Sequence, residues 1–236
     1  MIKYVLFDLD GTLLPMDQER FFTMYFHGLS THVELPGHTP REIGKAVWES
    51  SRVMAKNDGT KRNEEVFWEA FARICGEEVL INKADFDSFY DEKFDAISVI
   101  ARPDVKIAEI IKKLKSKGYT LAIATNPMFP RIATKKRIEW AGLDAADFEF
   151  YTTYEDSRHC KPNLDYYRDV MKMLGATAEE CIMVGNDVGE DMIARKLGMK
   201  VFLITECLIN NTGEDIENYP SGSFDDLIEY LEMINE

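Results

Sequence analysis

Two acidic residues follow the first apolar segment at a spacing that suits metal or phosphate chemistry. Residues 4–9 (YVLFDL) form an apolar run that only Asp8 interrupts, and Asp10 and Gly11 come directly after it. Alternate residues of an extended chain point to the same side, so Asp8 and Asp10 bring two carboxylates together. Such crowding favours an oxygen-seeking divalent cation, and Mg²⁺ usually takes one or two carboxylates with water and substrate phosphate. A pair of capping or turn-forming aspartates is the alternative, since Asp-Gly is common in turns.

A second acidic cluster follows a later apolar run. Residues 181–184 (CIMV) precede the segment 185–191 (GNDVGED), in which Gly189 allows close backbone approach and Asp191 lies one helical turn after Asp187. Open parallel sheets bind ligands at the carboxyl ends of their strands, so the two clusters predict one acidic sheet edge. A plain helix N-cap remains the alternative for Asp187.

Two further segments carry groups that could hold a phosphoryl oxygen. Thr125-Asn126 follows the apolar run 119–124 and places a hydroxyl and an amide at the same edge, where neutral donors add no charge. Lys161-Pro162 lies between two predicted elements, and its ammonium could balance the aspartates and bind phosphate as a point charge. A Thr-Asn helix cap and a solvated lysine are the structural alternatives.

Apolar spacing predicts the elements that would position these residues. After Arg102-Pro103 we expect helices at 104–117, 130–141, 164–174, 189–197 and about 224–233, and strands at 119–124, near 148–151, at 181–184 and at 200–204. Alternation with short connections is typical of βαβ units and a parallel sheet. From about residue 17 to residue 100, aromatic and aliphatic residues recur at helical spacing instead. The sequence therefore predicts an α/β protein with a helical insertion after its first strand.

Composition excludes several classes of protein. The 236 residues include 28 Lys+Arg and 42 Asp+Glu, a formal net charge of −14 that argues against a nucleic-acid-binding surface. The four cysteines form no CxxC pair, so we expect reduced thiols and no zinc site. We see no apolar run near the roughly 18 residues of a membrane span and no signal-peptide pattern. A soluble cytoplasmic protein that binds neither nucleic acid nor membrane is expected.

In this order, the four segments resemble the motifs of the haloacid dehalogenase (HAD) superfamily of phosphotransferases. The matching residues are Asp8, Asp10 and Thr12, then Thr125-Asn126, then Lys161-Pro162, then Asn186-Asp187 with Asp191. The resemblance spans residues 8–191 and implies a Rossmann-like parallel sheet core with helices on both faces. It also implies that the insertion is an α-helical bundle cap, with core residues 1–15 and 101–236 and cap residues 16–100.

The resemblance implies a role for each matched residue. Asp8 would attack phosphorus and form an aspartyl-phosphate, which divides one hard hydrolysis into two displacements. Asp10 would protonate the leaving alcohol and then deprotonate the attacking water. Lys161, as a catalytic residue, would hold the phosphoryl oxygens together with Thr125 and Asn126. Asp8, the Asp10 carbonyl and Asp187 would bind Mg²⁺. Thr12, Asn186 and Asp191 would orient the residues that contact the substrate or the metal.

The expected activity is Mg²⁺-dependent hydrolysis of a small phosphorylated metabolite. Dehalogenases that resemble this scaffold lack an acid at the position of Asp10, because a halide leaves without a proton, so phosphate esters are favoured. A sugar phosphomutase of the β-phosphoglucomutase type is the first alternative, and a non-catalytic binding module is the second. The joint 56–63 is the best candidate for a cap loop that reaches substrate through Lys61 or Arg62, with a solvated turn as the alternative. Substrate identity and oligomeric state stay open.

Overall fold

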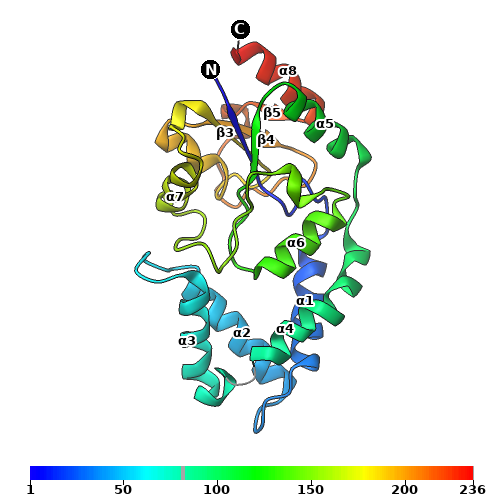
Figure 1. Ribbon diagram of the computed structural model, residues 1–236, viewed down its shortest axis with the longest axis vertical. Helices are drawn as coiled ribbons and strands as arrows, with labels where there is room; N and C mark the ends of the chain where they lie inside the picture. Colours follow the sequence, from blue (N-terminus) through cyan, green and yellow to red (C-terminus); the bar gives the residue numbers. More distant parts are fainter. Residues whose placement is uncertain (81–82, 236) are drawn as a thin grey trace.

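The computed structural model describes residues 1–80 and 83–235 and is built around a parallel sheet (Figure 1). The strands are β1 (Tyr4–Phe7), β2 (Thr120–Ile123), β3 (Cys181–Gly185), β4 (Lys200–Ile204) and β5 (Ser221–Gly222). They lie in the order β2-β1-β3-β4-β5, and every neighbouring pair is parallel. Phe7 is in register with Ile123 and with Val184, so β1, β2 and β3 end at one level. The predicted α/β fold with a parallel sheet is confirmed.

Helices cover both faces of the sheet, because alternate strand residues enter two separate hydrophobic clusters. These helices are α5 (Val105–Ser116), α6 (Arg131–Trp140), α7 (Leu164–Leu174) and α8 (Phe224–Asn235), with the 3₁₀ helices η3 (Ala145–Asp147), η4 (Ala178–Glu180), η5 (Met192–Leu197) and η6 (Ile216–Asn218). Val5 and Phe7 pack in the cluster that contains residues of α5 and α8. Leu6 packs in the cluster that contains residues of α7 and η5. β1 is therefore buried on both sides, as its apolar sequence predicts.

In the described residues between β1 and α5, the chain is largely helical. This segment contains α1 (Gln18–His32), α2 (Pro40–Met54), α3 (Asn63–Cys75), η1 (Glu77–Leu80), α4 (Lys83–Glu92) and η2 (Phe94–Ile100). Local sequence sets the helix starts: Asp17 caps α1, and Thr39 forms a capping box with Glu42 at the start of α2. Figure 1 shows these helices beyond one end of the sheet.

The two connections between the sheet and the inserted helices run side by side. Met16 forms an antiparallel bridge with Ala101, and the amide of Arg102 donates to the Pro15 carbonyl at 2.8 Å. The chain thus leaves and re-enters the sheet region at one place.

Three local predictions were wrong. The expected strand near 148–151 is reduced to a single bridge between Tyr151 and Ile123. The expected α-helix 189–197 is the shorter 3₁₀ helix η5. Gly189 and Glu190 instead belong to a turn after β3, in which their amides donate to Asp187 Oδ1. The two-residue strand β5 was not expected, since so short a segment carries no periodicity.

Candidate active site

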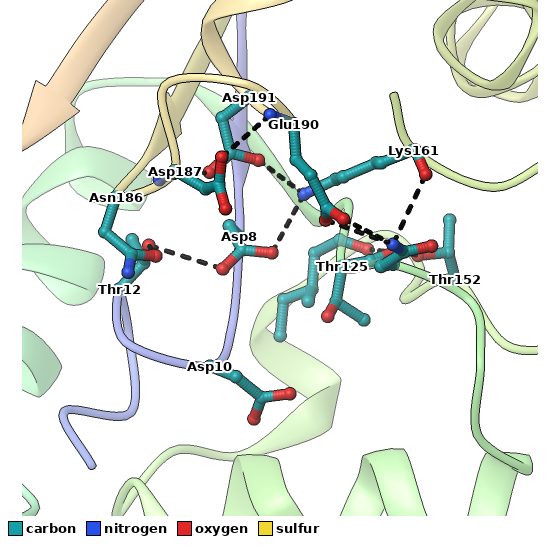
Figure 2. Close-up of polar contacts among 12 residues, drawn as sticks. Asp8, Asp10, Thr12, Thr125, Thr152, Lys161, Asn186, Asp187, Glu190 and Asp191 are labelled. Carbon is teal, nitrogen blue, oxygen red and sulfur yellow. Dashed lines mark hydrogen bonds and ion pairs between the residues drawn. The ribbon is translucent and has the colours of Figure 1, made fainter. Parts of the chain in front are cut away.

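Three neighbouring strands end together and bring the predicted polar residues to one place. Asp8 follows β1, Thr125 lies two residues beyond β2, and Asn186 follows β3. Figure 2 shows these residues with Lys161 around one centre. The register of the three strands accounts for the convergence, because the carboxyl ends of parallel strands share one sheet edge.

Lys161 joins the two acidic clusters. Its Nζ donates to Asp8 Oδ1 at 2.8 Å and to Asp191 Oδ1 at 2.6 Å, and its side chain is fully buried. Burial alone would lower the pKa of this ammonium, but the carboxylates of Asp191 and Asp8 outweigh burial and hold the pKa well above its ordinary value. Lys161 is therefore a buried, permanently charged group beside Asp8, and not a solvated lysine.

Asp10 lies in a different environment from Asp8. Its carboxylate pairs with the Arg137 guanidinium, and its Oδ1 is buried with no hydrogen-bond partner. Burial raises the pKa of Asp10 to about 6, with Arg137 opposing the rise and Asp8 adding to it. The Asp10 carbonyl accepts a hydrogen bond from Gln18 Nε2 at 2.7 Å. Asp10 thus has a carboxyl group that can gain or lose a proton near neutral pH.

Hydrogen bonds of Thr12, Asn186 and Asp191 hold the residues of the site in place. Thr12 Oγ1 donates to Asn186 Oδ1 at 2.9 Å, and Asn186 Nδ2 donates to the Cys207 carbonyl at 2.6 Å. Asp191 Oδ2 accepts the amide of Asp187 at 3.0 Å while its Oδ1 binds Lys161. These bonds fix the turn after β3.

Asp187 has the capping geometry considered from the sequence. Its Oδ1 accepts the amides of Gly189 at 2.7 Å and Glu190 at 2.9 Å. Both bonds use one carboxylate oxygen, which leaves the other available to a ligand. Capping and ligand binding are therefore compatible at this residue.

Thr125 and Asn126 line the site from the β2 side. Thr125 is buried, and its carbonyl accepts Thr152 Oγ1 at 2.6 Å and Tyr166 Oη at 2.8 Å. Asn126 Nδ2 donates to both carboxylate oxygens of Glu190, at 3.0 and 3.1 Å, whereas its buried Oδ1 has no partner. Both residues face the same cavity as Asp8.

Sequence reasoning missed two charged residues of the site. Glu190 lies between Gly189 and Asp191, and no role was predicted for it from the sequence. Burial raises the pKa of Glu190 to about 8, with Lys161 opposing the rise. Arg137 follows Lys135 and Lys136 on α6, so the sequence alone does not single it out. Its 1% side-chain exposure and its contact with Asp10 are tertiary facts.

The joint 56–63 does not deliver its basic residues to the cavity. Lys61 pairs with Glu69 at 2.5 Å, and Arg62 pairs with Asp156 at 3.6 Å. The joint instead docks on the loop before Lys161, where the buried Asn63 donates to the His159 carbonyl at 3.3 Å. The expectation that Lys61 or Arg62 reaches substrate is wrong in this structure, because nearby carboxylates hold both side chains outside the cavity lining.

A cavity of about 500 Å³ lies between the sheet edge and the inserted helices. Its floor consists of the strand-end residues already described, together with Lys161 and Glu190. Its opposite wall comes from α1, α2 and the loop before α6, and includes Phe22, Phe26 and Trp48. The volume lies within the range of small-molecule sites.

The donor set at the floor suits a hard divalent cation. Among the described residues that line the cavity, five are acidic (Asp8, Asp10, Asp187, Glu190, Asp191) and two are cationic (Lys161, Arg52). Within residues 1–80 and 83–235, no three His, Cys, Asp or Glu side chains are arranged to hold a metal ion. A cation here would therefore take two carboxylates and a backbone carbonyl, with water or phosphate completing the shell, as Mg²⁺ commonly does.

Comparisons with known proteins relate this chain to one family. A family model described as haloacid dehalogenase-like hydrolase matches residues 2–198. The pyrophosphatase PpaX of Bacillus velezensis is 28% identical over 204 residues, which cover 84% of this chain and 81% of that protein. The PpaX of Halalkalibacterium halodurans is 27% identical, with coverages of 86% and 83%. A HAD phosphatase structure from Thermococcus onnurineus superposes with a TM-score of 0.61 at 21% identity, over 98% of each chain.

Proposed function

Because this chain belongs to the haloacid dehalogenase-like hydrolases, we propose that it is a Mg²⁺-dependent phosphomonoester hydrolase that acts through an aspartyl-phosphate on Asp8. The observation that carries the proposal is the Lys161 bridge between Asp8 and Asp191, at 2.8 and 2.6 Å, at the carboxyl end of β1. A buried ammonium in that position can hold a phosphoryl group against the Asp8 carboxylate.

Two displacements complete the reaction. The Asp8 carboxylate attacks phosphorus, the bond from phosphorus to the ester oxygen breaks, and Asp10 gives its proton to the departing alcohol oxygen. Water then attacks the aspartyl-phosphate, Asp10 takes the water proton, and the bond from Asp8 to phosphorus breaks to release inorganic phosphate. Atoms and protons balance, and both aspartates return to their starting states.

The surrounding residues hold the transferred group. Lys161, Thr125 and Asn126 would bind its oxygens, and Thr12, Asn186 and Asp191 would keep the floor in place through their hydrogen bonds. Asp8, the Asp10 carbonyl and Asp187 would hold Mg²⁺, which when bound neutralises charge that develops on the phosphoryl oxygens. An acid at position 10 favours an alcohol leaving group over a halide, because an alkoxide needs a proton and a halide does not.

The proposal extends to the core and cap boundaries, the location in the cell and the partners. Residues 1–15 and 101–236 would form the core and residues 16–100 the cap, a division supported by the paired crossings at Met16 and Ala101. Within the described residues, every helix is too short or too polar to traverse a bilayer. We place the enzyme in the cytoplasm, acting on a small phosphorylated compound with no nucleic-acid or membrane partner.

Pyrophosphate is a second candidate substrate, favoured by the names of the PpaX relatives. The same floor residues would transfer its phosphoryl group to Asp8, with phosphate in place of an alcohol as the leaving group. Comparing kcat/KM for pyrophosphate with kcat/KM for phosphate esters separates the two candidates.

Substitution of the nucleophile tests the proposal. Asp8→Asn keeps the size of the side chain but removes the attacking oxygen anion, so turnover of p-nitrophenyl phosphate with Mg²⁺ should fall by at least about a thousandfold. Asp225→Asn, the same change at an exposed position of α8, is the control and should keep full activity. Near-normal turnover by purified, folded Asp8→Asn protein would exclude the aspartyl-phosphate mechanism.

A further inference from the structure

The cavity wall that faces the catalytic carboxylates is aromatic. Phe22 and Phe26 of α1 stack with ring centroids 6.3 Å apart, and Phe26 meets Trp48 of α2 edge-on at 5.8 Å. All three line the cavity, yet Phe22 remains 42% exposed and Trp48 50% exposed. Figure 1 shows α1 and α2 among the inserted helices, across from the sheet edge. Large aromatic side chains that stay half-exposed inside a cavity are available to a ligand.

A second aromatic layer holds this wall in place. Phe21 and Tyr25 are buried, line the cavity beside Phe22 and Phe26, and both pack edge-on against Phe129, at 5.7 and 5.1 Å. The hydroxyls of Tyr25 and Tyr90 lie 2.8 Å apart and satisfy each other inside the cluster. The rings that face the cavity therefore rest on a packed support, so little ordering is needed when a ligand binds.

The same wall offers little to a charged or polyhydroxylated leaving group. Among the described lining residues, Lys161 is committed to Asp8 and Asp191, and the other cation, Arg52, is 57% exposed and lies 3.6 Å from Glu49. Gln18 already donates to the Asp10 carbonyl. A second phosphoryl group or a row of hydroxyls pressed against Phe22, Phe26 and Trp48 would lose water that these rings cannot replace, and the polar groups of α2 in the lining are limited to Ser51 and Arg52.

We propose that the preferred substrate is a phosphate monoester whose leaving group carries a flat aromatic ring, held against Phe22, Phe26 and Trp48. This inference rests on the proposed function, since the ring site is defined by its position opposite Asp8 and Asp10. Ring stacking adds attraction beyond the apolar area that is buried. A volume of about 500 Å³ accommodates a ring in addition to the phosphoryl group.

Substrates with matched leaving groups test the inference. Benzyl, cyclohexylmethyl and ethyl phosphate all release a primary alcohol, so intrinsic reactivity differs little among them. We expect kcat/KM for benzyl phosphate to exceed that for ethyl phosphate roughly a hundredfold and that for cyclohexylmethyl phosphate about threefold to tenfold. Pyrophosphate should be a poorer substrate than benzyl phosphate.

Variants of the wall locate the effect. Trp48→Ala should lower kcat/KM for benzyl phosphate about tenfold more than kcat/KM for ethyl phosphate, whereas Trp48→Phe should restore most of the difference. Val53→Ala is the control, because Val53 lies on the same helix, is 47% exposed and is not part of the cavity lining. It should match the unmodified enzyme on every substrate.

The outcomes separate this inference from the phosphatase proposal. The aromatic site would be overturned if kcat/KM for ethyl phosphate or pyrophosphate were at least as high as for benzyl phosphate. It would also be overturned if Trp48→Ala lowered kcat/KM equally for all substrates. Either result would leave the phosphatase proposal intact. If no ester is hydrolysed, the phosphatase proposal fails, and calorimetry with benzylphosphonate and ethylphosphonate still tests the ring site. Tighter binding of benzylphosphonate that Trp48→Ala abolishes would support it, and equal binding of the two would overturn it.

Discussion

Asp8 and Asp10 are two residues apart, yet their surroundings prepare them for different tasks. Asp8 accepts a hydrogen bond at 2.8 Å from the buried Lys161 ammonium, which holds its carboxylate in place at the end of β1. Asp10 is buried beside Arg137, and burial raises its pKa to about 6, which suits a group that must alternately donate and accept a proton. Different environments for paired carboxylates are a general way to assign acid and nucleophile roles.

Arg137 should control the pH dependence of the enzyme through Asp10. Asp10 acts as an acid in the first displacement only when protonated, so kcat/KM should fall as pH rises through its pKa. Arg137 lowers that pKa, so Arg137→Gln should raise it and move the alkaline limb of the profile to higher pH. The measurement is kcat/KM against pH for one alkyl phosphate, so that ionisation of the substrate is common to both enzymes.

Lys135→Gln provides the matched control for that experiment. Lys135 lies on the same helix, is exposed and loses the same charge, so its profile should coincide with that of the unmodified enzyme. An alkaline limb that stays in place or moves to lower pH in Arg137→Gln would show that Asp10 is not the group that titrates.

At the scale of elements, the end of β3 depends on a glycine. A Cβ at Gly185 would overlap the carboxylate of Asp191. Gly185→Ala should therefore displace Asp191 from Lys161 and lower kcat by about a hundredfold, because a shift of roughly 1 Å at supporting residues can cost that much. Steady-state kinetics with p-nitrophenyl phosphate measures the effect.

Gly44→Ala on α2 is the comparison for this substitution. Its Cβ would meet Ser30 Cβ at 3.5 Å, an ordinary contact, and alanine favours the helix, so activity and stability should be kept or slightly raised. Equal kcat in Gly185→Ala and the unmodified enzyme would mean that Asp191 does not position Lys161 for catalysis.

Elements with a long, regular pattern could be predicted from the sequence, and irregular ones could not. Residues 164–174 and 200–204 form α7 and β4 with the expected bounds, because apolar spacing there matches one period throughout. Tyr151 contributes only one bridge, although its segment reads as a strand. Whether such a segment pairs along its length depends on the neighbouring strand, which lies far away in sequence.

The residues of the site also divide into those that could be located from the sequence and those that could not. Residues that directly follow strands, such as Asp8 and Asn186, could be located from the sequence because the sheet edge gathers them. Arg137 and Trp48 could not, since each lies on a helix whose orientation toward the cavity is set by packing. Lys61 and Arg62 were misplaced because their partners Glu69 and Asp156 cannot be identified from spacing alone.

At the scale of the whole molecule, the formal charge of −14 and the acidic cavity floor should slow the encounter with anionic substrates. Salt screens such repulsion, since the Debye length shortens to about 8–10 Å at physiological ionic strength. With Mg²⁺ saturating, kcat/KM for a dianionic phosphate ester should therefore rise severalfold between about 10 and 150 mM salt. The value of kcat should change little, because it reports steps after binding. A fall in kcat/KM with salt would instead mean that Lys161, Arg52 and the bound cation dominate the electrostatic field at the cavity. The cavity would then attract anions despite the net negative charge of the molecule.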